Sequence, residues 1–164
     1  MISGHNSKIL KDSDESEQKC NCRNRAACPL ENKCQTKNLI YQATVKQTLQ
    51  NKSETYIGLT ATSFKDRLAN HKTSFKYASK SGNTSLAGHI WDLKKKNMEE
   101  DKDYTISWKL IDRAQPFSPI SGVCNLCTTE KYHIIFNPEA ATLNKKEEIN
   151  NSCLHKDPIL LDKT

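Results

Sequence analysis

The stretch LIYQATVKQTLQNKSETYIGLTATSFKDRLANH, residues 39–71, decides the fold of this chain. In residues 39–46, every second side chain is apolar or aromatic and falls on one face, and this period of two is typical of a strand: Leu39, Tyr41, Ala43 and Val45. Residues 51–53, Asn-Lys-Ser, predict a turn, and residues 55–59 predict the strand that returns. We therefore expect a β-hairpin.

A helix is expected directly after this hairpin. Thr62 or Ser63 can cap its start, and Asp66 is placed to complete a capping box. Apolar side chains four and seven residues apart predict its buried stripe: Phe64, Leu68 and Phe75.

The rest of the pattern predicts one more strand and two more helices. A helix is expected over residues 85–96, and alternation from Tyr104 to Leu110 indicates a strand. A last helix begins near Asn125 and stops before Pro138. This order predicts an α/β (α+β) sandwich, with a three-stranded, mainly antiparallel sheet flanked by helices.

Five polar side chains carry the candidate chemistry: Tyr41, Tyr56, Arg67, His71 and Glu130. Because paired strands bring neighbouring side chains together on one face, the two tyrosines are expected to converge. Arg67 and His71 are one turn apart on a helical face that borders the buried stripe, so both should lean toward the sheet. The plainer alternative is that the tyrosines are ordinary aromatic residues of strands and that Arg67 and His71 lie on a solvated helix face.

Glu130 is harder to explain as a surface residue. It lies on an apolar helical stripe, with Leu126 and Ile134 four residues to either side. A buried carboxylate is costly unless it is paired or bound to a cation. Either an ion pair with Arg67 or a bound metal ion would satisfy it, and the two are not exclusive.

Together these groups suit hydrolysis of a phosphodiester with Mg²⁺ or Mn²⁺. A metal ion on Glu130 would neutralise the phosphate and stabilise the leaving group. Arg67 could bind the same phosphate through two donors. Tyr41, its pKa lowered by these cations, could take a proton from the attacking water, while Tyr56 and His71 orient the water or the phosphate. One such site would cut one strand.

All seven cysteines fall into two groups. The first, just before the hairpin, has the spacing C-x-C-x5-C-x5-C: Cys20, Cys22, Cys28 and Cys34. The second combines a C-x2-C pair with C-x-H in the tail: Cys124, Cys127, Cys153 and His155. Eight ligands suffice for two tetrahedral zinc sites. The alternative is that some are ordinary buried thiols.

Charge and composition set the surroundings of this domain. The net charge of +6 favours an anionic partner, most commonly a nucleic acid, although a lysine-rich surface without such a partner has the same charge. No apolar run approaches the about 20 residues needed to span a membrane, and the N-terminus lacks a signal-peptide core. We therefore expect an intracellular protein without a membrane partner. Because thiols stay reduced inside the cell, clustered cysteines there favour metal binding over disulfides.

The chain divides into four parts. Residues 1–19 are polar and charged and predict a disordered lead-in. A cysteine-rich, zinc-binding segment follows over residues 20–37, and the sandwich domain is expected over residues 38–150. Residues 151–164 form a C-terminal tail that carries the last candidate zinc ligands.

Several of these motifs resemble the GIY-YIG endonuclease superfamily, over about residues 38–145. The resemblance rests on Leu39-Ile40-Tyr41, Tyr56-Ile57-Gly58, the Arg67/His71 helix, Glu130 and Asn144. It implies a metal-dependent endonuclease with a small sandwich fold. Leu39 stands where the motif has a glycine, so the packing of the first strand must differ.

A more specific resemblance is to the endonuclease domain of Penelope-like retroelements. It rests on Cys20-Asn21-Cys22-Arg23, Cys28-Pro29-Leu30, Cys34, Ser85-Leu86, His89-Ile90-Trp91, Cys124-Asn125-Leu126-Cys127, Glu130-Lys131 and Cys153-Leu154-His155. In that family the domain follows a reverse transcriptase in one polyprotein and nicks target DNA, which exposes a 3′-hydroxyl that primes copying. The resemblance implies DNA as substrate, a nuclear location, and an excised domain or domesticated remnant.

Two alternatives stay open after this resemblance. Since the family is expected to have a motif of two cysteines and two histidines, Cys28 and Cys34 could instead pair with histidines, His89 foremost. The function could also be that of a zinc-stabilised nucleic-acid-binding module that no longer cuts. A redox or zinc-storage protein is disfavoured by the basic surface and the long core without cysteines.

Overall fold

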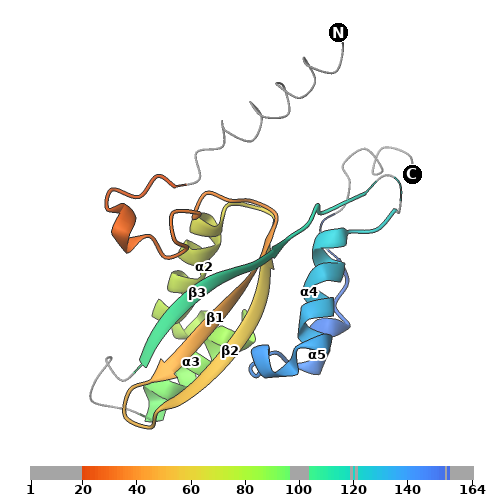
Figure 1. The fold of residues 1–164 in the computed structure, drawn as a ribbon. Coiled ribbons are helices and arrows are strands. Elements are labelled where there is room, and N and C mark those ends of the chain that lie inside the picture. Colours follow the sequence, from red (N-terminus) through yellow and green to blue (C-terminus); the bar gives the residue numbers. More distant parts are fainter. Residues whose placement is uncertain (1–19, 97–103, 119, 121, 154, 156–164) are drawn as a thin grey trace.

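The computed structural model describes residues 20–96, 104–118, 120, 122–153 and 155 (Figure 1). The expected disordered lead-in over residues 1–19, together with Leu154 and the tail from residue 156 onward, lies outside the described residues. The described elements are η1 (Arg25–Ala27), β1 (Leu39–Gln47), β2 (Lys52–Thr60), α2 (Phe64–Lys76), η2 (Ala78–Lys80), α3 (Ser85–Lys96), β3 (Tyr104–Arg113), α4 (Asn125–Phe136), η3 (Pro138–Ala140) and α5 (Lys146–Ile149).

The predicted three-stranded antiparallel sheet is confirmed, with strand order β2-β1-β3. The hairpin turns slightly earlier than we expected, because Asn51 takes a left-handed backbone conformation (φ 47°) and pairing begins again at Lys52. In the resulting register Tyr41 lies opposite Gly58, and Ala43 lies opposite Tyr56. Both tyrosines therefore project from the same face of the sheet.

Helices cover both faces of this sheet (Figure 1). On one face, α2 and α3 pack on the odd-numbered residues of β1, and their main buried side chains include Phe64 and Ile90. On the other face, α4 packs through Leu126 and Ile134 on Ile40 and Ile57. The domain is thus an α+β sandwich with β2 at the edge of its sheet. None of the helices that the structure describes is both long and apolar enough to cross a lipid bilayer.

The start of α2 is fixed by its cap and by the cysteine-rich segment. Ser63 is the N-cap, and its hydroxyl accepts from the Asp66 backbone N–H at 3.2 Å and donates to the Asp66 carboxylate at 2.7 Å. The carbonyls of Thr36 and Cys34 accept from the N–H groups of Phe64 and Lys65, which the helix itself leaves unpaired. The segment before β1 is therefore part of the folded domain.

The helical stripe of α2 differs in one residue from our expectation. Phe64 and Leu68 are buried as expected, but Phe75 is only partly buried, and His71 and Ser74 fill the remaining buried positions. The cause is the sheet beneath, where the Tyr41 hydroxyl provides a hydrogen-bonding partner for the imidazole.

Candidate active site and metal centres

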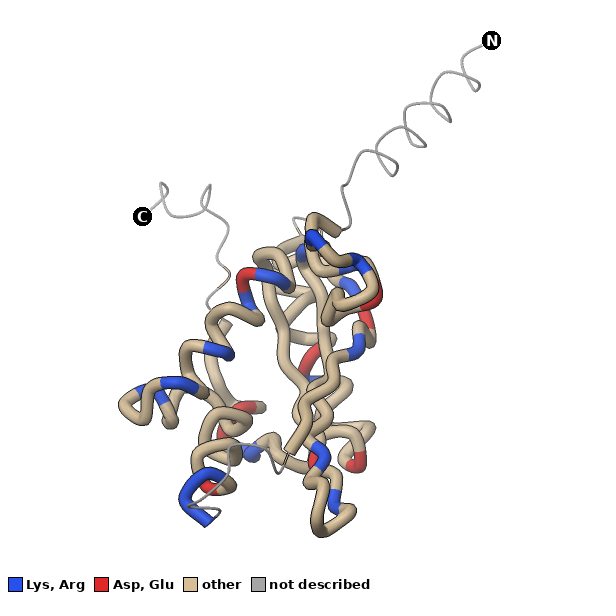
Figure 2. Tube along the Cα trace, turned by 90° about the vertical axis from the view of Figure 1, so that its left-hand side faces the viewer, with Lys and Arg blue, Asp and Glu red and all other residues tan. Residues whose placement is uncertain are grey.

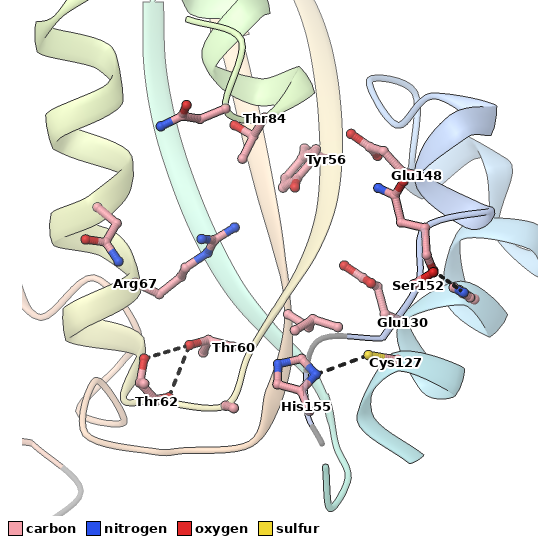
Figure 3. A pocket seen from close by; sticks show the side chains of 16 residues that line it. Tyr56, Thr60, Thr62, Arg67, Thr84, Cys127, Glu130, Glu148, Ser152 and His155 are labelled. Atoms are coloured by element: carbon pink, nitrogen blue, oxygen red, sulfur yellow. Dashed lines mark hydrogen bonds between the residues drawn. The ribbon is translucent and has the colours of Figure 1, made fainter. Parts of the chain in front are cut away.

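A cleft of 590 Å³ opens along the β2 edge of the sheet, between the α2 layer and the α4 layer (Figure 3). Arg67 reaches into it from α2, and Glu130 and Glu148 point toward it from the opposite wall (Figure 3). Tyr56 lines it from β2. Three of the five predicted catalytic residues, Tyr56, Arg67 and Glu130, therefore line one cleft.

The other two predicted residues lie beneath this cleft in a hydrogen-bonded group. The Nε of Arg67 donates to the Tyr41 hydroxyl oxygen at 3.1 Å, and this oxygen lies 2.6 Å from His71 Nε2. The hydroxyl donates to Nε2 in the tautomer of His71 that carries its proton on Nδ1. Burial, followed by the charge of Arg67, lowers the His71 pKa to about 3, so this imidazole is neutral and can accept the proton.

Tyr41 requires a correction. We expected its hydroxyl to take a proton from an attacking water, with a lowered pKa. Instead Tyr41 is fully buried, does not line the cleft, and has a pKa raised by burial, which outweighs the opposing effect of Arg67. Its position indicates that Tyr41 holds Arg67 and His71 in place, while Tyr56 is the tyrosine that lines the cleft.

Gly58 gives Tyr41 the space it occupies. A Cβ atom on Gly58 would lie 2.5 Å from the Tyr41 hydroxyl oxygen and 2.9 Å from Cε1 of Tyr56. Tyr41 cannot move away cheaply, since Arg67 and His71 hold its hydroxyl. The glycine of the YIG motif is therefore required by the packing of the two tyrosines.

We predict that Gly58→Ala destabilises the fold by about 1–3 kcal/mol, the usual cost of overpacking a core. Urea unfolding of the variant and of the wild type would measure this loss. Gly82→Ala is the matched control, because a Cβ there meets nothing within 4 Å and its effect should stay within about 0.5 kcal/mol. Equal stabilities of the two variants would contradict this account of Gly58.

The two carboxylates of the cleft, Glu130 and Glu148, interact electrostatically. Burial, with a contribution from the nearby Glu148, raises the Glu130 pKa to about 7, and Arg67 opposes this shift. Both Glu130 and Arg67 are described, yet no ion pair joins them within 4 Å. The simple ion pair considered as an alternative for Glu130 is thus not formed within this distance, although the charge of Arg67 still acts to lower the pKa of Glu130.

Glu148 is the residue of this site that sequence reasoning missed. It lies on α5 and accepts hydrogen bonds from the Ser85 hydroxyl and from Asn144 Nδ2, the latter at 2.8 Å. Asn144 also pairs with the backbone of Ile57 at the free edge of β2, donating to its carbonyl and accepting from its N–H at 2.8 Å each. In the sequence, Glu148 belongs to the charged run Lys-Lys-Glu-Glu over residues 145–148, which looks like an ordinary exposed segment. Only the nearby Asn144 indicates that this segment belongs to the site.

The cysteines converge in the two predicted groups, and none of them is in a disulfide. Within each group all ligand atoms lie within 4.8 Å of one another, so each group could hold a zinc ion. In the second group the Cys127 and Cys153 sulfurs are 3.4 Å apart, and His155 Nδ1 is 3.2 Å from the Cys127 sulfur. Tetrahedral ligands at Zn–S of about 2.3 Å would be separated by about 3.8 Å, close to these values.

The alternative zinc ligand His89 is not brought to the cysteines. It lies on α3, where its charged neighbours include Glu54 and Asp92, and its Nε2 is buried without a hydrogen-bond partner. Cys28 and Cys34 instead meet Cys20 and Cys22. The four-cysteine ligand set is therefore the one that the fold assembles.

We predict that His71 makes stability fall in acid. An unfolded histidine titrates near pH 6.5, so between that pH and about 3 the unfolded chain binds a proton that the folded chain does not. The stability that this neutral histidine confers is complete above about pH 6.5 and is lost as pH falls, by about 2 kcal/mol at pH 5. From pH 7 to 5, urea unfolding should show a drop larger by that amount in the wild type than in His71→Gln. Equal drops would contradict this, since all other titrating groups are shared.

Comparisons of this chain with protein-family models, curated proteins and solved structures find no match. The lysines and arginines of the described residues are spread over many elements, so they do not single out one basic face as a binding surface (Figure 2). The geometry of the cleft is therefore the main guide to function.

Proposed function

We propose that this protein is a metal-dependent DNA endonuclease that hydrolyses phosphodiester bonds and nicks one strand. One observation carries the proposal: an arginine faces two carboxylates across a cleft with a tyrosine on its wall. A phosphate ester would meet Arg67 on one side and a metal site on the other. This arrangement supports the GIY-YIG resemblance of the motifs that supply Tyr56, Arg67 and Glu130.

The donors of the cleft fit a hard divalent cation. Glu130 and Glu148 offer carboxylate oxygens, which Mg²⁺ and Mn²⁺ prefer. The raised pKa of Glu130 reflects burial and a neighbouring negative charge, both of which a cation would offset. When bound there, Mg²⁺ or Mn²⁺ would stabilise charge on the phosphate and on the leaving group.

The protein's own groups would orient the substrate. Arg67 keeps its guanidinium toward the cleft, since its Nε is held by Tyr41, and its remaining donors can bind a phosphate oxygen. Tyr56 offers a hydroxyl at the cleft wall, where it can position the attacking water. Tyr41 and His71 act from below as positioning residues, and Glu148 holds the far wall through Ser85 and Asn144.

The two cysteine groups would bind structural zinc. The first lies next to the start of α2, the helix of Arg67, and the second includes the start of α4, the helix of Glu130. Cys127 and His155 also line the cleft. Zinc in these groups would fix both walls of the proposed active site.

The retroelement resemblance extends the proposal to a biological role. Nicking target DNA in the nucleus would expose a 3′-hydroxyl for target-primed reverse transcription by a reverse transcriptase in the same polyprotein. The alternative, an inactive zinc-stabilised module that only binds nucleic acid, shares every feature except catalysis.

The test is incubation of supercoiled plasmid with the protein in Mg²⁺ or Mn²⁺. We expect open-circle DNA to appear before linear DNA, and no product in EDTA. DNA binding without any cutting in either metal would favour the binding module.

A further inference from the structure

A second, smaller cavity of 230 Å³ adjoins the cleft. It is lined by α2, η2 and the segment before α3: Arg67, Asn70, His71, Thr73, Ser74, Lys80, Asn83 and Thr84. Four of these residues also line the larger cleft: Arg67, Asn70, Asn83 and Thr84. Arg67 and Thr84 lie on the wall away from Glu130 (Figure 3). The two cavities are therefore contiguous.

The smaller cavity has a different chemistry from the cleft. The cleft combines Arg67 and Lys131 with Glu130 and Glu148. The residues that line the smaller cavity include neither a carboxylate nor an apolar side chain, and two of them, Arg67 and Lys80, are cations. A cationic cavity with hydroxyl and amide donors suits an anion, and phosphate oxygens accept hydrogen bonds from these residue types.

Lys80, which lines this cavity, also contacts a neighbouring aromatic ring. Its Nζ lies 5.9 Å from the centroid of Tyr77, over the ring, and Lys76 lies over the same ring at 5.4 Å. Such contacts stabilise an ammonium over the face of the ring. Lys80 therefore brings a cationic side chain to the cavity lining, and its ammonium also contacts Tyr77.

We propose that the smaller cavity binds the phosphate next to the one that is cut. The protein then holds two consecutive phosphates of one strand, the reactive one between Arg67 and Glu130 and its neighbour at Lys80, Asn70 and Asn83. This rests on the proposed function and adds the path of the substrate strand. A nucleobase is a poorer occupant, because bases bind by stacking on exposed aromatic rings and no Phe, Tyr or Trp lines this cavity. A second metal ion would lack carboxylate ligands there.

The probes are the dinucleotides dTpdT, with one phosphate, and pdTpdT, with two. NMR titration of the full chain with Ca²⁺ at about 150 mM salt would give both affinities, under conditions that screen distant charges. We expect wild type to prefer pdTpdT about ten-fold, the value of one charge-assisted hydrogen bond. The extra phosphate should shift the side-chain amide signals of Asn70 and Asn83.

Lys80→Gln should reduce this preference to about one while the affinity for dTpdT stays unchanged, and Asn83→Ala should reduce it as well. Lys95→Gln is the matched control, because this lysine of α3 lines neither cavity and its loss should leave the preference as in wild type. Equal preferences in Lys80→Gln and wild type, or none in wild type, would overturn the proposal. Neither dinucleotide has to be cut, so this result is independent of plasmid nicking.

Discussion

Replacing Glu130 by glutamine is expected to lower the rate of DNA nicking by at least about 100-fold, because the variant keeps the shape of the side chain and loses the charge that would bind the metal ion. DNA binding measured without metal should persist or strengthen, since a negative charge is removed from the cleft. Plasmid nicking under single-turnover conditions and fluorescence anisotropy of a labelled duplex would measure the two effects.

The same substitution should stabilise the protein when no divalent metal is present. Glu130 has a folded-state pKa of about 7 against about 4.5 unfolded, so the folded chain binds the extra proton between these values. The stability of the neutral acid is present below about pH 4.5 and is lost as pH rises through 7. At pH 8 the ionised carboxylate therefore costs about 3 kcal/mol, which Glu130→Gln should recover in urea unfolding.

Glu147→Gln is the matched control, since Glu147 is an exposed acid next to Glu148 and does not line the cleft. Its nicking rate and stability should equal those of the wild type. A residue whose removal stabilises the fold and abolishes activity is a functional residue in the sense of a stability–activity trade-off. If Glu130→Gln nicked DNA at the wild-type rate, the assignment of Glu130 to the active site would be wrong.

The secondary structure was predictable because local signals agree with the packing. Alternation in residues 39–46 and 104–110 marks the faces of β1 and β3, and the pair Ser63 and Asp66 fixes the start of α2. The helix at residues 85–96 was placed at its observed bounds. The second strand of the hairpin begins at Lys52, earlier than predicted, because the left-handed conformation of Asn51 is set by the turn and not by periodicity.

The depth of each side chain was harder to predict than its position along an element. Tyr41 and Tyr56 share a face as expected, but the register places Tyr41 against Gly58 and beneath α2, and only the assembled layers show that it is fully buried. Glu148 was not predicted as a site residue, because its place in the cleft depends on a short helix and on two hydrogen bonds, from Ser85 and Asn144. The hydrogen bond from Ser85 joins residues 63 positions apart in the chain, and periodicity does not report such a contact.

The purified protein is expected to contain about two zinc ions per chain, and Cys127→Ser and Cys34→Ser should each retain about one. A ligand set of four fails when one strong donor is lost, and each substitution affects only its own group. Metal content by mass spectrometry, on protein prepared without chelator, would give the counts. His89→Ala is the control, because His89 lies outside both groups and its loss should leave two ions.

The two zinc losses should affect cutting through different walls of the cleft. Cys127 lies three residues before Glu130 on α4, so Cys127→Ser should displace the carboxylate, and a misplacement of about 1 Å can cost about 100-fold in rate. Cys34→Ser should instead loosen the segment that pairs with the start of α2, and with it Arg67. Since neither substitution removes a group to which the proposal assigns a role on the phosphate or on the catalytic metal ion, the remaining activity should still depend on Glu130. A metal-free wild type, or unchanged zinc counts in both variants, would show that these cysteines are ordinary thiols.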